Sequence, residues 1–362
     1  MKVAVVTGTR PEAIKLAPVI RLLGPEALVV HTGQHYSRSM SGHVAADVTM
    51  QAGRLPDETR GGQLGRLVVA LDRAFREHQP DTVLVQGDTT SALAGALAAN
   101  ATGIPLAHLE AGLRSFDRAM PEEHNRVLID HLSDLCCPPA SVAFGNLLAE
   151  RITPDRIEIT GNTIVEAVTA ALPTGPEQAA ILDGHQLARS GYVLATIHRA
   201  ENTDDARTLT TIMQELAALS VPVVFPVHPR TRRRLDAFGL ADLARKLRLT
   251  TPLAYPALLT LISNAAVIIS DSGGIQEEVT VLKRPVLIVR RSNERPEAER
   301  LFGKRVVPGA EISQVASAWI QDAAAIHERL AAIPTPYGDG YASTRLVHAL
   351  RIRHGHGGAA VA

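Results

Sequence analysis

Residues 271–278 carry the most informative chemistry of this chain. They read Asp-Ser-Gly-Gly-Ile-Gln-Glu-Glu and stand between two apolar runs, a pattern that predicts a strand, a tight turn and a helix. Ser272, Gly273 and Gly274 would open the helix, where unpaired backbone N–H groups favour an anion and glycine lets a phosphate approach closely. Glu278, about one turn further, is placed to accept hydrogen bonds from a ribose diol. The segment indicates a nucleoside diphosphate site, and the alternative is an ordinary glycine-containing turn that caps a helix.

Other polar residues that can do chemistry follow predicted strands. Asp88 and Glu110 come directly after apolar runs of the first half, and Glu122 lies in the loop that continues from Glu110. His198 and His228 follow apolar runs of the second half. Ligands of open α/β sheets bind outside the carboxyl ends of the strands. Three carboxylates facing a histidine and arginines suit proton transfer beside a phosphate, because carboxylates brought close together raise one another's pKa.

Each of these residues also has a structural interpretation. Asp88 precedes threonines and could cap a helix, and Glu110 could pair with Arg114 across a helical turn. Glu122 follows a proline and fits the acidic first turn of a helix, and His198 could be a buried histidine with satisfied hydrogen bonds. Independent capping does not explain why almost every predicted strand exit carries such a group, so we favour catalysis.

The elements that must position these residues alternate in two similar halves. Short apolar runs predict strands at 3–6, 27–30, 82–85, 105–108, 135–137 and 157–159, and again at 192–197, 221–227, 247–250, 267–270, 285–289 and 306–307. Longer amphipathic segments separate them, which predicts parallel strands with crossover helices. We therefore expect an α/β protein with two doubly wound parallel sheets and a ligand site in the crevice between them.

The predicted domains are residues 1–170, with the carboxylates, and residues 171–345, with the nucleotide-binding turn. Residues 346–362 would form a C-terminal helix and a disordered tail. A chain of 362 residues is longer than a single core usually supports, which agrees with two domains.

Composition narrows the class of protein. Lys+Arg and Asp+Glu number 37 each, so no global charge points to nucleic acid or a membrane surface. No apolar run approaches the ~20 residues of a membrane helix. The two cysteines, Cys136 and Cys137, are adjacent, which fits a reduced cytoplasmic compartment. Metal-binding, Walker, dinucleotide-binding and serine-nucleophile motifs are absent from the sequence, so we expect no metal and no cofactor.

Linked motifs along the chain resemble the non-hydrolysing UDP-N-acetylglucosamine 2-epimerases. They occupy residues 8–15, 86–90, 110–115, 121–126, 271–278 and 336–340. The resemblance runs in order from Val3 to about Leu350. It implies a GT-B-like fold of two Rossmann-type domains, a homodimer, a UDP-sugar substrate, and no metal or nicotinamide.

The implied reaction inverts C2 of the sugar and interconverts UDP-GlcNAc and UDP-ManNAc. Loss of the C2 proton with anti elimination of UDP gives a 2-acetamidoglucal, to which UDP adds again after protonation on the opposite face. Carried over by motif, Asp88, Glu110 and Glu122 are the acid/base carboxylates, and His198 assists at the phosphate. Which carboxylate is the base stays open. The residues implied to hold UDP and the sugar are Arg10, Lys15, Arg114, His228, Ser272, Gly273, Gly274, Glu278 and Arg295.

Two departures from the family leave alternatives open. Asn293 replaces a threonine in a loop expected near the sugar nucleotide and follows Arg290, Arg291 and Ser292, so a modified UDP-sugar is a competing substrate. Ser37 replaces a glutamine found in members activated by a second substrate molecule, so that activation is open. A hydrolysing epimerase that releases ManNAc, a GT-B glycosyltransferase and a catalytically silent nucleotide-sugar sensor are the other interpretations.

Overall fold

The computed structural model describes residues 1–34, 45–50 and 58–356. It divides into two compact units. The first combines Met1–Ala167 with the segment that begins at Tyr337, and the second is Val168–Pro336. The sequence analysis assigned residues 337–345 to the second domain, whereas the structure groups them with the first. Ser37 and the end of the predicted tail lie outside the described residues.

A six-stranded parallel sheet forms the centre of the first unit. Its strand order is β3-β2-β1-β4-β5-β6. The strands are β1 (Val3–Thr7), β2 (Ala27–His31), β3 (Val48–Thr49), β4 (Thr82–Gln86), β5 (Leu106–Leu109) and β6 (Leu135–Cys137). The predicted strand at 157–159 is reduced to an isolated bridge between Cys136 and Ile157, and the short β3 was not predicted. The register places β4 and β5 side by side, with Gln86 opposite Leu109. Residues that follow these two strands therefore lie at one edge of the sheet.

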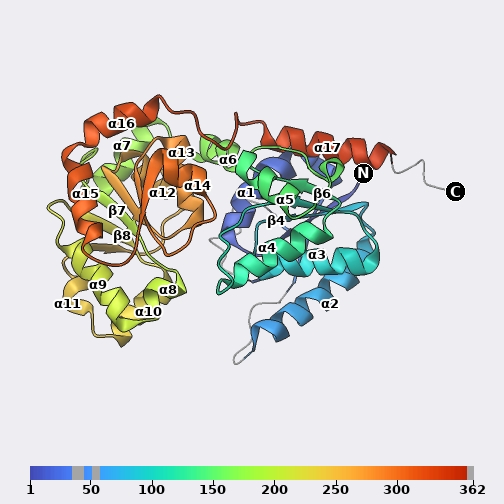
Figure 1. Ribbon diagram of the computed structural model, residues 1–362, viewed down its shortest axis with the longest axis horizontal. Helices are drawn as coiled ribbons and strands as arrows, with labels where there is room; N and C mark the ends of the chain where they lie inside the picture. Colours follow the sequence, from blue (N-terminus) through green and yellow to red (C-terminus); the bar gives the residue numbers. More distant parts are fainter. Residues whose placement is uncertain (35–44, 51–57, 357–362) are drawn as a thin grey trace. The chain divides into compact units, whose positions relative to one another are not determined.

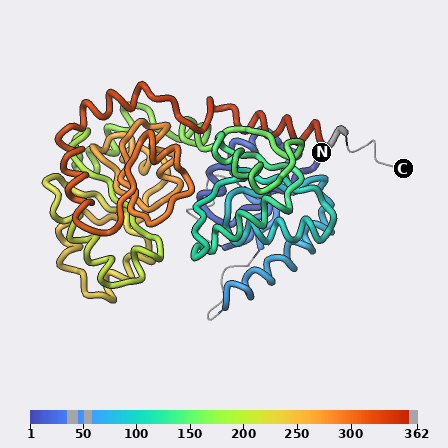
Figure 2. The backbone as a smooth tube through the Cα atoms, in the orientation of Figure 1, coloured from blue at the N-terminus to red at the C-terminus, as the bar shows by residue number. Residues whose placement is uncertain are grey.

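Helices connect the strands of this unit. They are α1 (Arg10–Leu23), α2 (Arg60–His78), α3 (Thr90–Thr102), α4 (Pro121–Leu132), α5 (Ser141–Ala149) and α17 (Ala342–His356), with short 3-10 turns η1 (Gly24–Glu26) and η2 (Pro154–Arg156). The boundary between the two units falls within α6 (Ile164–Ala171). Helix α17 lies beside α1 (Figure 1). Its Leu346, Val347 and Leu350 are buried in one apolar cluster with Val3 and Leu16. These contacts explain why the C-terminal segment belongs to the first unit. In Figure 2 this segment is the red end of the backbone tube.

The second unit repeats the architecture. Its strand order is β12-β11-β10-β7-β8-β9, again parallel. The strands are β7 (Val193–Thr196), β8 (Val223–Pro226), β9 (Arg248–Thr250), β10 (Val267–Ser270), β11 (Val286–Val289) and β12 (Gly303–Val306). The helices are α7 (Gly175–Gly184), α8 (Ala200–Thr203), α9 (Ala206–Ala217), α10 (Pro229–Ala237), α11 (Ala241–Ala244), α12 (Tyr255–Asn264), α13 (Gly273–Leu282), α14 (Pro296–Phe302), α15 (Glu311–Gln321) and α16 (Ala323–Ala331). Strands β10, β7 and β8 are neighbours, so the residues after them share one edge.

Two doubly wound parallel sheets confirm the predicted fold class. The inner strands β1, β4, β5, β10 and β11 are buried and rich in Val, Ile, Leu and Ala, as expected for sheets covered by helices on both sides. In the part of the chain that the structure describes, no helix combines the length and apolar character needed to cross a membrane.

Candidate active site

Helix α1 begins with a capping box, and the glutamate of that box also contacts the loop that follows β4. The Glu12 carboxylate accepts hydrogen bonds from the backbone N–H groups of Gly8 and Thr9, at 3.1 and 2.7 Å, and from the Thr9 hydroxyl. It also accepts a 2.7 Å bond from the Thr89 hydroxyl. Burial raises the pKa of Glu12, against the opposing effect of these hydrogen bonds. Glu12 was not among the site residues predicted from the sequence. The Thr-x-x-Glu spacing of a capping box was the available signal.

Glu110 lies at the end of β5 in a left-handed backbone conformation, with φ of 69°. The residue is 3 % exposed, and its carboxylate forms a buried ion pair with Lys15. It also accepts hydrogen bonds from the side-chain amides of Gln86 at 2.6 Å and Asn162 at 2.8 Å. The carboxylate is thus held by groups from three separate segments. The alternative in which Glu110 pairs with Arg114 is wrong, because Lys15 is its cationic partner.

Asp88 follows β4 and is bound by helix α4. Arg126 donates to its carboxylate from Nε at 2.9 Å and from Nη2 at 2.6 Å. Asn125 donates a 2.6 Å bond to the Asp88 backbone carbonyl. The residue that caps α3 is Thr89, whose hydroxyl accepts from Ala92 N–H. The capping interpretation of Asp88 is therefore wrong, and its side chain is 29 % exposed.

Two adjacent glutamates in the first turn of α4 have different environments. Glu123 is buried and accepts hydrogen bonds from the backbone N–H groups of Ser115 and Phe116 and from Arg126. Glu122 is partly exposed. Among the residues the structure describes, no hydrogen bond or ion pair is found for its side chain. Glu123 fixes the loop before the helix, and Glu122 remains available to a ligand.

Arg126 is the second residue that sequence reasoning missed. It is 2 % exposed and joins Asp88 to Glu123. The residue stands in the motif at 121–126, and the signal was its spacing of one helical turn from Glu122 and Glu123.

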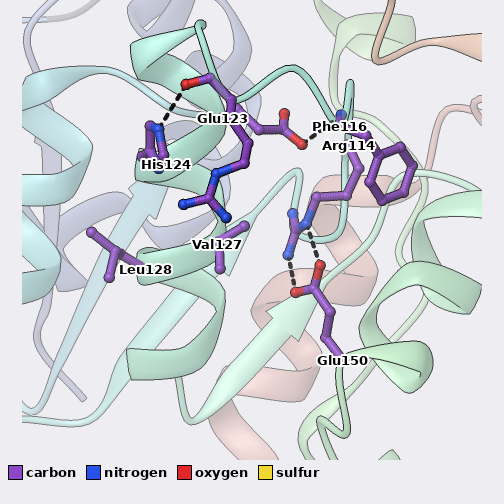
Figure 3. A pocket seen from close by; sticks show the side chains of 8 residues that line it. Arg114, Phe116, Glu123, His124, Val127, Leu128 and Glu150 are labelled. Atoms are coloured by element: carbon purple, nitrogen blue, oxygen red, sulfur yellow. Dashed lines mark hydrogen bonds and ion pairs between the residues drawn. The ribbon is translucent and has the colours of Figure 1, made fainter.

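Arg114 has a different setting from the one expected of a substrate ligand. Its Nε and Nη2 donate to the two oxygens of Glu150 at 2.8 and 2.6 Å (Figure 3). Nη2 also lies 2.7 Å from Asp130, and Nη1 donates to the Leu113 carbonyl at 2.8 Å. A pocket of about 420 Å³ lies beside this pair in the first unit, and Asp88, Glu110 and Glu122 do not line it. Its lining residues are Arg114, Phe116, Arg118, Glu123, His124, Val127, Leu128 and Glu150. Because its guanidinium already binds these acceptors, the structure favours a supporting role for Arg114.

In the second unit, Asp271 orients His198. Oδ1 of Asp271 lies 3.0 Å from Nδ1 of the imidazole. The same carboxylate accepts the backbone N–H groups of His198 and Arg199 at 3.0 and 2.8 Å, and the Asn202 amide at 3.0 Å. Burial alone would raise the pKa of Asp271, but His198 and these hydrogen bonds together lower it to about 2. Asp271 is therefore ionised, and the His198 side chain, 38 % exposed, keeps a fixed orientation.

His228 stands beside His198 at the next strand exit. The two ring centroids are 5.7 Å apart. Nδ1 of His228 accepts a 3.1 Å hydrogen bond from the Arg230 N–H and so caps α10. These two histidines and the turn after β10 follow the neighbouring strands β7, β8 and β10, and together they can contact one anionic ligand.

The Ser-Gly-Gly turn opens α13 as the sequence predicts, with Ser272 as the N-cap residue. No side-chain hydrogen bond caps this end of the helix, so its first N–H groups keep their capacity to bind an anion. A side chain at Gly273 would place its Cβ 2.8 Å from Cζ of Arg295, whereas a Cβ at Gly274 would have only Ser272 Oγ nearby, at 3.9 Å. Gly273 thus allows a buried guanidinium to pack against the turn.

Arg295 and Glu278 are two further predicted residues of the second unit. Arg295 donates to Glu277 at 2.6 Å and is paired with Glu294. Glu278 is 6 % exposed, on α13. Arg10, from the first unit, is partly exposed at the first position of α1.

Comparison with known proteins identifies the family. The family model described as UDP-N-acetylglucosamine 2-epimerase matches residues 24–351. This chain belongs to that family. Among its relatives, the UDP-N-acetylglucosamine 2-epimerase of Methanocaldococcus jannaschii is 36% identical, over 97% of this chain and 99% of the relative. The UDP-2,3-diacetamido-2,3-dideoxy-D-glucuronate 2-epimerase of Pseudomonas aeruginosa is 33% identical over the same shares of the two chains, 97% and 99%.

A solved structure gives the same result at the level of the fold. The M. jannaschii enzyme in complex with UDP-GlcNAc and UDP has a TM-score of 0.86 and 34% identity, covering 97% of this chain and 100% of that one. The fold is therefore GT-B-like, with two Rossmann-type units, and the chain is an isomerase of the epimerase class.

Proposed function

We propose that this chain is a non-hydrolysing UDP-N-acetylglucosamine 2-epimerase that interconverts UDP-GlcNAc and UDP-ManNAc. The observation that carries the proposal is the group of carboxylates at the edge of the first sheet. Asp88 and Glu110 follow neighbouring strands, and α4, which carries Glu122, binds the Asp88 segment directly through Asn125 and Arg126. A nucleotide-sugar sensor would need no such acid/base set, and a glycosyltransferase would need an acceptor pocket.

The second unit supplies groups suited to the diphosphate and ribose. The open N-terminus of α13, with Ser272, Gly273 and Gly274, would hold phosphate oxygens. His198, oriented by Asp271, would donate to the same anion, and Glu278 would accept from the ribose hydroxyls. These interactions strengthen as negative charge develops on departing UDP, and that differential stabilisation lowers the barrier.

The proposed reaction consists of proton transfers with elimination and addition of UDP, so it needs no redox cofactor. A carboxylate removes the C2 proton, the C2–H electron pair forms the C1–C2 double bond, and the C1–O bond breaks with its electron pair leaving on UDP. A second acid then protonates C2 on the opposite face while a UDP oxygen bonds to C1. Asp88, Glu110 and Glu122 are our candidates for these proton transfers, and Glu122 is the one without a protein partner among the described residues.

Not every residue implied by the resemblance is retained in this proposal. Lys15 is buried against Glu110, so we assign it to keep that carboxylate ionised. Arg114 is bound by Asp130 and Glu150, so we assign it a structural role. Arg10, His228 and Arg295 stay candidate ligands. The homodimer and the cytoplasmic location also stay predictions.

The test is incubation of the protein with UDP-GlcNAc in D₂O, followed by proton NMR. We expect UDP-ManNAc, deuterium at C2 of both sugars, and no accumulation of free ManNAc. Free ManNAc with UDP as the main product would instead identify a hydrolysing epimerase. Binding of UDP without any turnover would contradict both.

A modified UDP-sugar is the second candidate substrate. One relative of similar identity is a 2-epimerase of a UDP-diacetamido-dideoxyglucuronate. Arg291 is an exposed cation in the loop after β11, where a sugar carboxylate would find an opposite charge. Parallel assays with UDP-GlcNAc and the diacetamido uronate, on the wild-type protein and on Arg291→Ala, separate the two. Loss of turnover confined to the uronate would favour the second candidate.

A further inference from the structure

His108 and Asp130 form a buried pair behind the predicted acid/base carboxylates, and the function proposed above does not use them. His108 lies in β5 and its ring is buried. Its Nδ1 is 2.6 Å from Oδ1 of Asp130, and its Nε2 is 2.9 Å from the carbonyl oxygen of Gly87. A carbonyl oxygen only accepts hydrogen bonds, and so does an ionised carboxylate. Both ring nitrogens of His108 therefore contact oxygen atoms, and the ring links Asp130 to the peptide group that precedes Asp88.

Asp130 is held as a carboxylate by its other partners. It accepts the Gly112 N–H at 3.0 Å and lies 2.7 Å from Nη2 of Arg114. Burial would raise the pKa of Asp130, but His108 and Arg114 together lower it. Asp130 is therefore a hydrogen-bond acceptor toward each of these partners.

The hydrogen bonds around Asp88 indicate what the His108–Asp130 pair can do. The carbonyl of Gly87, immediately before Asp88, accepts from His108, and the carbonyl of Asp88 itself accepts from Asn125 at 2.6 Å. The Asp88 carboxylate is bound by Arg126. Asn125, Arg126 and Asp130 all belong to α4. One helix therefore binds Asp88 directly through Asn125 and Arg126, and binds the Gly87 carbonyl before it through the imidazole.

Asp130 also contacts the loop that follows β5 and carries Glu110. Gly112, whose N–H it binds, stands two residues after Glu110 and has φ of 79°. A side chain on Gly112 would collide with the Ala143 carbonyl, 2.2 Å from the added Cβ. The loops that carry Asp88 and Glu110 are thus both tied to the same buried carboxylate.

We propose that Asp130, acting through His108, is a positioning residue that sets the placement of Asp88 relative to Glu110. The proposal rests on the proposed function, because it concerns the geometry of the same proton transfers. Displacement of a reacting group by about 1 Å can cost ~10²-fold in rate. UDP binding should not change, since His198, Glu278 and the turn at Ser272, which we propose as ligands of the diphosphate and ribose, belong to the second unit.

The test compares Asp130→Asn with Asp134→Asn. Asp134 also binds the backbone near β5, accepting the Leu106 N–H at 2.8 Å, but it is remote in the hydrogen-bond network from Gly87 and Gly112. We expect Asp130→Asn to lower kcat about 10- to 100-fold, with KM and the calorimetric Kd for UDP unchanged, and Asp134→Asn to keep the wild-type kcat. His108→Gln removes the link between Asp130 and the Gly87 carbonyl, so it should lower kcat to a similar extent and leave the Kd for UDP unchanged.

The possible results distinguish failure of the positioning role of Asp130 from failure of the proposed function. Wild-type turnover of a UDP-sugar with an unchanged kcat in Asp130→Asn would overturn the inference and leave the proposed function standing. A wild-type kcat in His108→Gln would overturn it even if Asp130→Asn did not fold. Absence of UDP-sugar turnover by the wild-type protein would overturn the proposed function, and the inference with it.

Discussion

The carboxylate of Asp271 accepts hydrogen bonds from both the side chain and the backbone N–H of His198. The imidazole is therefore fixed at the end of β7, with Nδ1 committed to the carboxylate, so Nε2 is the nitrogen available to a ligand. A histidine oriented in this way loses little conformational entropy when it binds a diphosphate. Asp271 lies in the motif that suggested nucleotide binding, but its contacts assign it to the histidine.

Asp271→Asn should destabilise the protein by ~2–3 kcal/mol at pH 7. The pKa of Asp271 falls from 3.8 to about 2 on folding, so its contribution to the free energy of unfolding is complete above pH ~4 and is lost as the pH falls toward 2. Urea denaturation of wild type and variant between pH 7 and pH 3 measures the difference. The difference in the free energy of unfolding between the two proteins should become smaller as the pH falls. Asp236→Asn, at an exposed position of α10, is the control and should show no such dependence.

Asp88→Asn and Glu122→Gln should each lower turnover by ~10²–10⁴-fold. The amides keep the size and the acceptor oxygen of each side chain but cannot exchange a proton. Calorimetric affinity for UDP and the melting temperature of Glu122→Gln should stay close to wild type. Asp88→Asn should also melt slightly lower because its pair with Arg126 is weakened. Near wild-type turnover in either variant would remove that residue from the set of acids and bases.

Glu278→Ala should weaken UDP binding by ~1–3 kcal/mol, the value of a charged hydrogen bond. If the carboxylate binds the ribose diol, 2′-deoxy-UDP should bind the wild-type protein more weakly than UDP does, and the variant should bind both alike. Calorimetry with the two nucleotides measures this. Equal affinities of the wild-type protein for both would show that Glu278 has no ribose role.

Gly273→Ala should lower thermal stability more than Gly274→Ala. The added methyl group at 273 meets the guanidinium of Arg295, which is paired with Glu277 and Glu294, whereas the one at 274 meets only Ser272 at 3.9 Å. Overpacking of this kind costs ~1–3 kcal/mol. Differential scanning fluorimetry without ligand compares the two variants. A larger loss for Gly274→Ala would contradict the packing we describe.

The sequence was sufficient to predict the fold and the strand exits because parallel strands buried on both faces read as continuous apolar runs. The strands of both sheets were found close to their observed bounds, except for the two-residue β3, the bridge at Ile157, and β12, which was predicted at 306–307 and lies at Gly303–Val306. A two-residue strand has too few residues to show a pattern. The return of residues 337–356 to the first unit was not predicted, because a helix's partner surface is not encoded in its own periodicity.

Sequence reasoning identified which polar residues stand at the strand ends but not how they pair. Lys15 was expected at the phosphates, and it pairs with Glu110 from another segment. Arg114 was expected at the substrate, and it pairs with Asp130 and Glu150. Such pairs depend on crossover geometry, which motif spacing does not specify. His108 and Asp130 were missed as a pair for the same reason.

The position of α17 has a consequence for biosynthesis. The ribosome releases the whole of Val168–Pro336 before the residues that complete the first unit. Until Leu346, Val347 and Leu350 arrive, the nascent first unit lacks the aliphatic side chains that cover Val3, Val5 and Leu16. A nascent chain is thus exposed to aggregation or chaperone capture at this surface, while the second unit already has its full sequence. The unit that carries the proposed acid/base carboxylates would be completed last, so premature termination would yield a complete second unit beside an unfinished first one.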